Sequence, residues 1–205
     1  MVKTRVRRLR RSRGSAEGIV GCMFSGKSDE LIRRLRLAQI AGERVLAFKP
    51  RIDNRYTVRW VASHAGGRFK AHPVKKVAQI LQIVDRENPT VVGIDEIQFL
   101  GEEASVLVQE LASRGLRVIF AGLNLDFRGE PFGPMTHLMP QADQLEMMTA
   151  ICSVCGGDAT RSQRLIDGHP ARYNDPVVKV GAEELYEARC RKHHKVPGKP
   201  RRRIK

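Results

Sequence analysis

The segment that decides the fold of this chain is Gly21-Cys22-Met23-Phe24-Ser25-Gly26-Lys27-Ser28. It matches the pattern GxxxxGK[ST], in which backbone N–H groups at the start of a helix bind phosphate. A strand that is weak by composition, Glu17–Val20, precedes it, and a strongly periodic segment, Lys27–Ile40, follows. Lys27 offers a charge for the β- and γ-phosphates and Ser28 a hydroxyl for Mg²⁺. The sequence therefore predicts a phosphate-binding strand–loop–helix unit, although a plain glycine turn before a helix is the simpler alternative.

Strand and helix patterns alternate after this loop. Apolar and β-branched runs predict buried strands, and apolar residues three and four positions apart predict helices. The expected strands are Arg44–Phe48, Thr90–Ile94 and Leu116–Gly122, and the expected helices are Lys27–Ile40, Pro73–Val84 and Glu102–Ser113. Residues 50–72 are expected to form a long excursion, and Asn124–Gln141, which is rich in Gly and Pro, a loop. This order is typical of an α/β fold, a P-loop parallel β-sheet flanked by helices.

The composition indicates a protein with a buried core and charged ends. Of its 205 residues 41% are hydrophobic, which excludes disorder of the whole chain. No run of 18 apolar residues and no secretory signal are present, so we expect no membrane span and a cytoplasmic protein. The net charge is +15, but residues 1–13 and 192–205 each carry seven Lys or Arg and no acid; subtracting these fourteen leaves +1 for residues 14–191. Such charge blocks are usually solvated tails, and binding to nucleic acid or a transit peptide are the alternatives.

Two carboxylates follow the expected strand Thr90–Ile94. Ligands of an open α/β sheet gather at the carboxyl ends of its strands, so Asp95 or Glu96 can hold Mg²⁺ opposite the phosphate loop. Neighbouring residues point to different faces of a strand, which gives the two acids separate roles. One role is metal binding, and the other is that of a general base for a hydroxyl that attacks the γ-phosphate. A solvated strand end is the alternative.

A second polar motif, Asp53-Asn54-Arg55-Tyr56, lies in the long excursion. An arginine there can reach a triphosphate and stabilise the charge that is transferred. Loop Asp and Arg are also common surface residues, so the motif alone is a weak indication.

Cysteine and histidine form two paired ligand motifs near the C-terminus, Cys152-x₂-Cys155 and, after 34 residues, Cys190-x₂-His193. Four protein ligands leave no open coordination position, so the pattern predicts structural Zn²⁺. His194 is the alternative fourth ligand, and unliganded thiols are the alternative to a metal site. Cys22 lies in the phosphate loop and outside this set.

Seven motifs occur in order: GCMFSGKS, KPRIDNRY, GIDEIQFL, GLNLDFRGEPFG, AICSVCG, SQRL and YEARCRKHH. In these motifs, from about residue 17 to 194, the chain resembles the thymidine kinases of the zinc-containing type. The resemblance implies transfer of the ATP γ-phosphoryl group to the 5′-hydroxyl of thymidine, and also of deoxyuridine. It further implies a homotetramer and feedback inhibition by dTTP, without any need for nucleic acid.

The resemblance also implies roles for single residues. Glu96 is the implied base for the 5′-hydroxyl proton, and Ser28 and Asp95 are implied for Mg²⁺. ATP and phosphate binding is implied for Gly21, Cys22, Met23, Phe24, Ser25, Gly26, Lys27, Ser28, Asp53, Asn54, Arg55, Asp95 and Gln98. Thymidine binding is implied for Met23, Phe99, Leu123, Phe127, Thr160, Val177, Val178, Lys179, Val180, Gly181 and Tyr186. Part of this set lies on a loop, the lasso, whose two ends the zinc holds.

The expected organisation has four parts: a basic disordered tail (1–14), a P-loop nucleotide-binding α/β domain (15–149), a zinc-binding ribbon or lasso domain (150–194) and a basic tail (195–205). Three residues depart from the family pattern: His193 stands where cysteine is frequent, Lys179 lies in an apolar stretch, and Asn124 replaces a common Asp. The alternatives are a kinase that prefers deoxyuridine or deoxycytidine, a P-loop ATPase acting on nucleic acid through the tails and zinc knuckle, and a zinc-ribbon module with an inactive nucleotide site. The nearly neutral body disfavours the ATPase, and the intact phosphate loop disfavours the inactive module.

Overall fold

A parallel six-stranded sheet forms the centre of the molecule. In this computed structural model, residues 14–51, 60–63, 66–178 and 185–200 are described. The strands are β1 (Ser15–Gly21), β2 (Val45–Pro50), β5 (His72–Val74), β6 (Val91–Ile94), β7 (Arg117–Gly122) and β8 (Gln144–Met148). Their order is β5-β2-β6-β7-β1-β8, and all neighbouring pairs are parallel. The predicted fold class is confirmed, and β8 is an edge strand that the sequence did not reveal.

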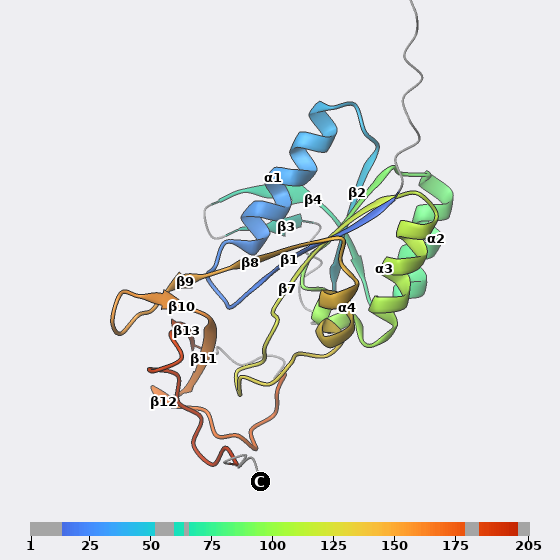
Figure 1. The fold of residues 1–205 in the computed structure, drawn as a ribbon. Helices are drawn as coiled ribbons and strands as arrows, with labels where there is room; N and C mark the ends of the chain where they lie inside the picture. Colours follow the sequence, from blue (N-terminus) through green and yellow to red (C-terminus); the bar gives the residue numbers. More distant parts are fainter. Residues whose placement is uncertain (1–13, 52–59, 64–65, 179–184, 201–205) are drawn as a thin grey trace, which may run out of the picture.

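Helices cover both faces of this sheet (Figure 1). Helix α1 (Lys27–Ile40) packs on one face against Ile19 and Ile119, and has the predicted bounds. Helices α2 (Val77–Glu87) and α3 (Glu103–Ser113) pack on the other face against Val20 and Phe120. Consecutive strand residues alternate between the two cores, as the pleat requires. At Gly93 a Cβ would lie 2.7 Å from a methyl of Leu35, so the absence of a side chain lets α1 approach the sheet closely.

Three predicted segments differ from the structure. The helix expected from Pro73 begins only at Val77, because residues 72–74 pair with β2 as an edge strand, where proline is tolerated. The segment Asn124–Gln141 is not all loop, since it ends in helix α4 (Met135–Gln141), whose Met135 and Leu138 are buried. The excursion contains a hairpin of β3 (Trp60–Ala62) and β4 (Arg68–Lys70), which packs Val61 and Phe69 on the α1 side.

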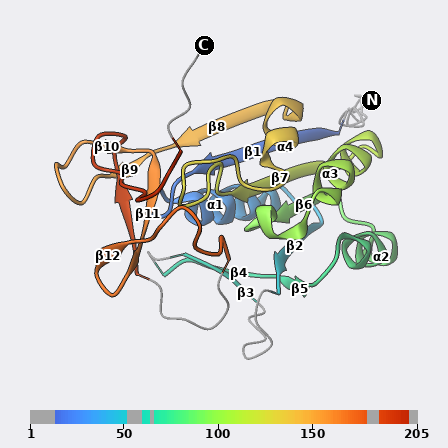
Figure 2. The same cartoon turned by 90° about the horizontal axis from the view of Figure 1, so that it is seen from below.

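A small C-terminal unit lies beyond the carboxyl ends of β1 and β7 (Figures 1 and 2). Its strands are β9 (Ala150–Ile151), β10 (Asp158–Ala159), β11 (Arg161–Ile166), β12 (His169–Pro170) and β13 (Leu185–Arg189), in two antiparallel sheets. Cys22 packs against this unit, with its Sγ donating to the carbonyl of Ala159 at 3.3 Å. In the described part of the chain, no helix has the length and apolarity needed to cross a membrane.

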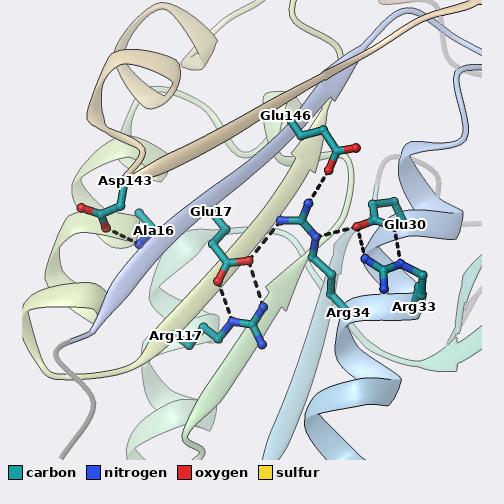
Figure 3. A network of polar contacts seen from close by, with 8 residues as sticks. All are labelled: Ala16, Glu17, Glu30, Arg33, Arg34, Arg117, Asp143 and Glu146. Atoms are coloured by element: carbon teal, nitrogen blue, oxygen red, sulfur yellow. Dashed lines mark hydrogen bonds and ion pairs between the residues drawn. The ribbon is translucent and has the colours of Figure 1, made fainter.

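A polar network explains why β1 is weak by composition (Figure 3). Glu17 is 5% exposed, and its carboxylate accepts hydrogen bonds from Arg117 at 2.6 Å and Arg34 at 3.0 Å. Burial raises the pKa of Glu17, but the two guanidinium groups outweigh it, so that the pKa lies below its ordinary value. Arg34 also contacts Glu30 on α1 and Glu146 on β8. The buried acid therefore ties β1 to β7, to β8 and to α1.

Candidate active site

The phosphate loop connects β1 to α1 and has a tightly bonded backbone. Gly26 precedes the helix with φ 85°, a conformation that favours glycine. Ser25 Oγ and Lys27 Nζ both donate to the carbonyl of Cys22, at 2.8 and 2.7 Å. Burial lowers the pKa of Lys27, while the nearby charges of Glu96, Cys22 and Asp95 act in the opposite direction. A bound phosphate would give Lys27 a stronger partner than this carbonyl.

Asp95 and Glu96 follow β6 but do not lie on opposite faces of a strand, as the sequence had suggested. Glu96 has φ 51° and directly precedes a short 3₁₀ helix, η1 (Ile97–Leu100). Its Oε2 accepts from Gln98 Nε2 at 2.5 Å, and Gln98 Oε1 accepts from the backbone N–H of Leu123 at 3.2 Å. The left-handed turn places both carboxylates at one cavity. Phe24, with φ 65°, also lines this cavity, and such backbone strain is concentrated at functional sites.

The Asp95 carboxyl is 3% exposed and accepts from Ser28 Oγ at 3.3 and 3.4 Å. Burial first, and then the charge of Glu96, raise the pKa of Asp95 from 3.8 to about 7, against the opposing charge of Lys49. A buried carboxylate held at a high pKa gains strongly from a cation. Ser28 and Asp95 therefore fit Mg²⁺ by their chemistry, a hydroxyl and a carboxylate facing one another beside a phosphate loop.

A cavity of about 520 Å³ connects these polar groups to an apolar end. Its size is within the range of small-molecule sites. The lining residues are Met23, Phe24, Gly26, Lys27, Ser28, Asp29, Lys49, Ala62, Ser63, Asp95, Glu96, Phe99, Leu123, Phe127, Phe132, Ser162, Val177, Val178 and Tyr186. The cavity thus has a charged end built by the sheet domain and an apolar end to which the C-terminal unit contributes.

Most site residues expected from the sequence are found at or beside this cavity. Met23, Phe99, Leu123, Phe127, Val177, Val178 and Tyr186 line it, whereas Gln98 lies behind Glu96. Thr160 does not line the cavity, and its Oγ accepts a hydrogen bond from the neighbouring Arg161 at 3.1 Å. Asp53, Asn54, Arg55, Lys179, Val180 and Gly181 lie outside the described residues.

Six lining residues were missed in the sequence: Asp29, Lys49, Ala62, Ser63, Phe132 and Ser162. Ser162 accepts a hydrogen bond from the backbone N–H of Met23 at 3.0 Å, so it joins β11 to the phosphate loop. Phe132 meets Phe99 edge to face, with ring centroids 5.4 Å apart. Lys49 lies near the carboxyl end of β2 and lines the cavity together with the two carboxylates. Of Ser162, Phe132 and Lys49, only Lys49 had a signal that sequence reasoning could have used, a lysine at the carboxyl end of a predicted strand.

The two Cys/His motifs meet in the C-terminal unit. The ligand atoms of Cys152, Cys155, Cys190 and His193 all lie within 4.8 Å of one another, and Cys155 Sγ is 3.9 Å from Cys190 Sγ. Sulfur ligands at zinc–sulfur bonds of about 2.3 Å would lie roughly 3.8 Å apart in a tetrahedron, so the set fits structural zinc. Burial raises the pKa of Cys152, but hydrogen bonds from backbone N–H groups, that of Cys190 foremost, and from His193 lower it to about 5, which favours the thiolate.

His194 is not a member of this cluster. Its Nε2 donates to the carbonyl of Phe127 at 2.8 Å. The structure therefore groups His193, and not its neighbour, with the three cysteines.

Comparison with known proteins gives consistent matches. The family model described as thymidine kinase matches residues 14–194. The thymidine kinase of Deinococcus deserti is 56% identical over 194 residues, which cover 90% of this chain and 96% of that protein. The thymidine kinase of Coprothermobacter proteolyticus is 53% identical over 186 residues, which cover 91% of this chain and 93% of that protein.

Proposed function

The chain belongs to the thymidine kinase family and phosphorylates thymidine, and we propose that the transfer takes place in the cavity between the phosphate loop and the C-terminal unit. The observation that carries this assignment is the shared cavity itself. Its charged end holds Lys27, Asp95 and Glu96, as phosphoryl transfer requires, and its apolar end has the aromatic rings that suit a base.

In this proposal Glu96 accepts the proton of the thymidine 5′-hydroxyl. The oxygen then forms a bond to the γ-phosphorus, the bond between that phosphorus and the β–γ bridging oxygen breaks, and ADP leaves. The hydrogen bond from Gln98 orients the Glu96 carboxylate, and Lys27 neutralises charge on the phosphates. Ser28 and Asp95 would hold Mg²⁺, which supplies positive charge to the phosphate oxygens when bound. The arginine of the Asp53-Asn54-Arg55 motif is proposed to contact the triphosphate.

The thymine ring is proposed to lie at the apolar end, among Phe99, Leu123 and Phe127. Val177, Val178 and Tyr186 come from the two sides of the lasso, whose remaining proposed contacts are Lys179–Gly181. The zinc ligands fix both roots of this loop, because Cys190 follows β13 directly and Cys152 precedes β10 and β11. Structural zinc would thus hold the two ends of the loop beside the proposed nucleoside site.

The test of this assignment is a phosphoryl-transfer assay with Mg·ATP, thymidine, deoxyuridine and deoxycytidine. We expect transfer to thymidine and, less efficiently, to deoxyuridine. Glu96→Gln should lower kcat by roughly 10²–10⁴ while ATP still binds. Retention of most of the activity in this variant would remove Glu96 as the base.

The same assay distinguishes thymidine phosphorylation from the alternative activity, ATP hydrolysis stimulated by nucleic acid. A P-loop ATPase acting on nucleic acid would hydrolyse ATP faster when DNA or RNA is added, without a nucleoside. A homotetramer, inhibition by dTTP and a cytoplasmic location remain proposals from the family resemblance. Analytical ultracentrifugation and a dTTP titration of the activity test the first two.

A further inference from the structure

The short segment after the zinc knuckle, His194–Lys199, contacts the loop that carries Phe127. We propose that this segment, here called the brace, positions the Phe127 loop and thereby sets the affinity for the nucleoside. The inference rests on the proposed placement of thymidine beside Phe127.

The brace first holds Phe127 through its backbone. His194 Nε2 donates to the Phe127 carbonyl at 2.8 Å, and His194 follows the zinc ligand His193 directly. The backbone N–H groups of both histidines donate to the carbonyl of Cys190, at 3.1 and 3.0 Å, so the turn of the knuckle fixes where His194 points. One hydrogen bond, from His194 to Phe127, thus links the metal-binding cluster to a residue that lines the cavity.

The other end of the brace holds the same loop. Lys199 Nζ donates to the carbonyl of Arg128 at 2.5 Å and pairs with Glu130 at 3.1 Å. Gly129 lies between these contacts, where a Cβ would be 3.5 Å from the His194 ring and 3.6 Å from Lys199 Nζ. The side chains of His194 and Lys199 therefore contact residues 127–130 on both sides of a turn.

The middle of the brace is held by the C-terminal unit. Gln163 is 1% exposed, and its side chain donates to the carbonyl of Lys195 at 3.0 Å and accepts from the Lys195 N–H at 2.8 Å. The carbonyl of Pro197 accepts from the backbone N–H of Tyr173 at 2.9 Å. Because the brace is fixed to β11, it can position the Phe127 loop rather than follow it.

The ring of Phe127 has a separate partner, Arg164, which also helps to position Phe127. The Arg164 guanidinium lies 5.2 Å from the ring centroid, and its Nη1 donates to the carbonyl of Pro176, next to the lasso residues Val177 and Val178. The carbonyl held by His194 and the ring held by Arg164 together define the wall of the cavity. Because thymidine is proposed to lie beside Phe127, the brace is expected to affect the affinity for thymidine and not the affinity for ATP.

The experiment compares thymidine and ATP in the zinc-loaded full chain. His194→Ala should raise the thymidine KM, and the thymidine Kd by calorimetry, roughly 5-fold, the effect of one hydrogen bond. The ATP KM should stay within about twofold, and zinc content should stay near one per chain. His194→Gln, whose amide can donate to the same carbonyl, should restore thymidine affinity. Lys199→Met should raise the thymidine KM about 3-fold by removing the second contact.

Two controls make the result decisive. Lys195→Ala is the matched control in the brace, because Lys195 is exposed and its hydrogen bonds to Gln163 use its backbone. Phe127→Ala must raise the thymidine KM if the proposed site is correct, and an unchanged KM there would refute the site itself. If Phe127→Ala is impaired but His194→Ala and Lys199→Met keep thymidine KM within twofold, or raise the ATP KM equally, the brace is refuted. Should His194→Ala lose zinc or fail to fold, Lys199→Met decides alone, since it lies outside the knuckle.

Discussion

The buried carboxyl of Asp95 should make the free protein less stable as the pH rises. In the folded protein, burial and then the charge of Glu96 raise the pKa of this group to about 7. In the unfolded chain the pKa lies near its ordinary value of 3.8. The folded state therefore binds the proton more tightly. The stability that Asp95 contributes is fully present below pH 3.8 and is lost as the pH rises through about 7.

Replacing Asp95 by asparagine removes this dependence, because the amide cannot ionise. The two pKa values differ by about 3 pH units, and each unit corresponds to about 1.4 kcal/mol, so the variant should gain up to about 4 kcal/mol at pH 8. At pH 5.5 only the unfolded chain is ionised at this position, and the gain falls to about 2 kcal/mol. In a chain of this length the gain at pH 8 corresponds to a rise in Tm on the order of 10 °C.

The assay is thermal unfolding of Asp95→Asn and the parent protein at both pH values, without nucleotide or added divalent cation. Asp158→Asn, an exposed position on β10, is the control and should show no such change with pH. The same Asp95→Asn variant should lose phosphoryl transfer, since it weakens the proposed Mg²⁺ site. A variant that is no more stable than the parent at pH 8, or a gain that does not grow with pH, would show that Asp95 is not desolvated as described.

Three further changes test other parts of the structure. Lys27→Ala should abolish turnover and weaken ATP binding, and an unchanged ATP Kd by calorimetry would contradict the role of the phosphate loop. Removal of zinc with a strong chelator, checked by metal analysis, should weaken thymidine binding more than ATP binding, because the four ligands lie in the unit that supplies the lasso. Equal losses of thymidine and ATP binding would contradict the assignment of this unit to the nucleoside. Glu17→Gln should lower the free energy of unfolding by about 2 kcal/mol at pH 7, since Arg117 loses its carboxylate partner whereas Arg34 keeps Glu30 and Glu146. Denaturant titration checks this value, and a change below about 0.5 kcal/mol would mean that the network contributes little.

Much of the fold could be predicted because its signals are local. The helix Lys27–Ile40 was predicted with its observed bounds, since its apolar spacing and the glycine before it are read within one segment. The strands β6 and β7 were found within one residue because they are short apolar runs buried on both faces. Helix α4 was missed because Pro134 and Pro140 flank and interrupt it, and only the burial of Met135 and Leu138 stabilises so short a helix.

The arrangement of the carboxylates was predicted wrongly for a related reason. Strand alternation suggested that Asp95 and Glu96 point to opposite faces, but the chain leaves the strand at this point. The left-handed conformation of Glu96 is held by contacts with Gln98, whose other end bonds to Leu123 on a different strand connection. Such strain depends on distant partners and has no pattern in the neighbouring sequence.

The sequence alone determined the chemistry that this chain carries. A phosphate loop needs its glycines and lysine within eight residues, and a zinc knuckle needs two ligands three positions apart, so both are encoded in contiguous motifs. The tertiary structure decided what these motifs act on together. In the folded chain His193, and not His194, lies beside the three cysteines, and Ser162 contacts the phosphate loop. The fold also buries Asp95, which raises its pKa. Those outcomes depend on desolvation and on contacts between residues more than sixty positions apart, and only the packed fold creates either.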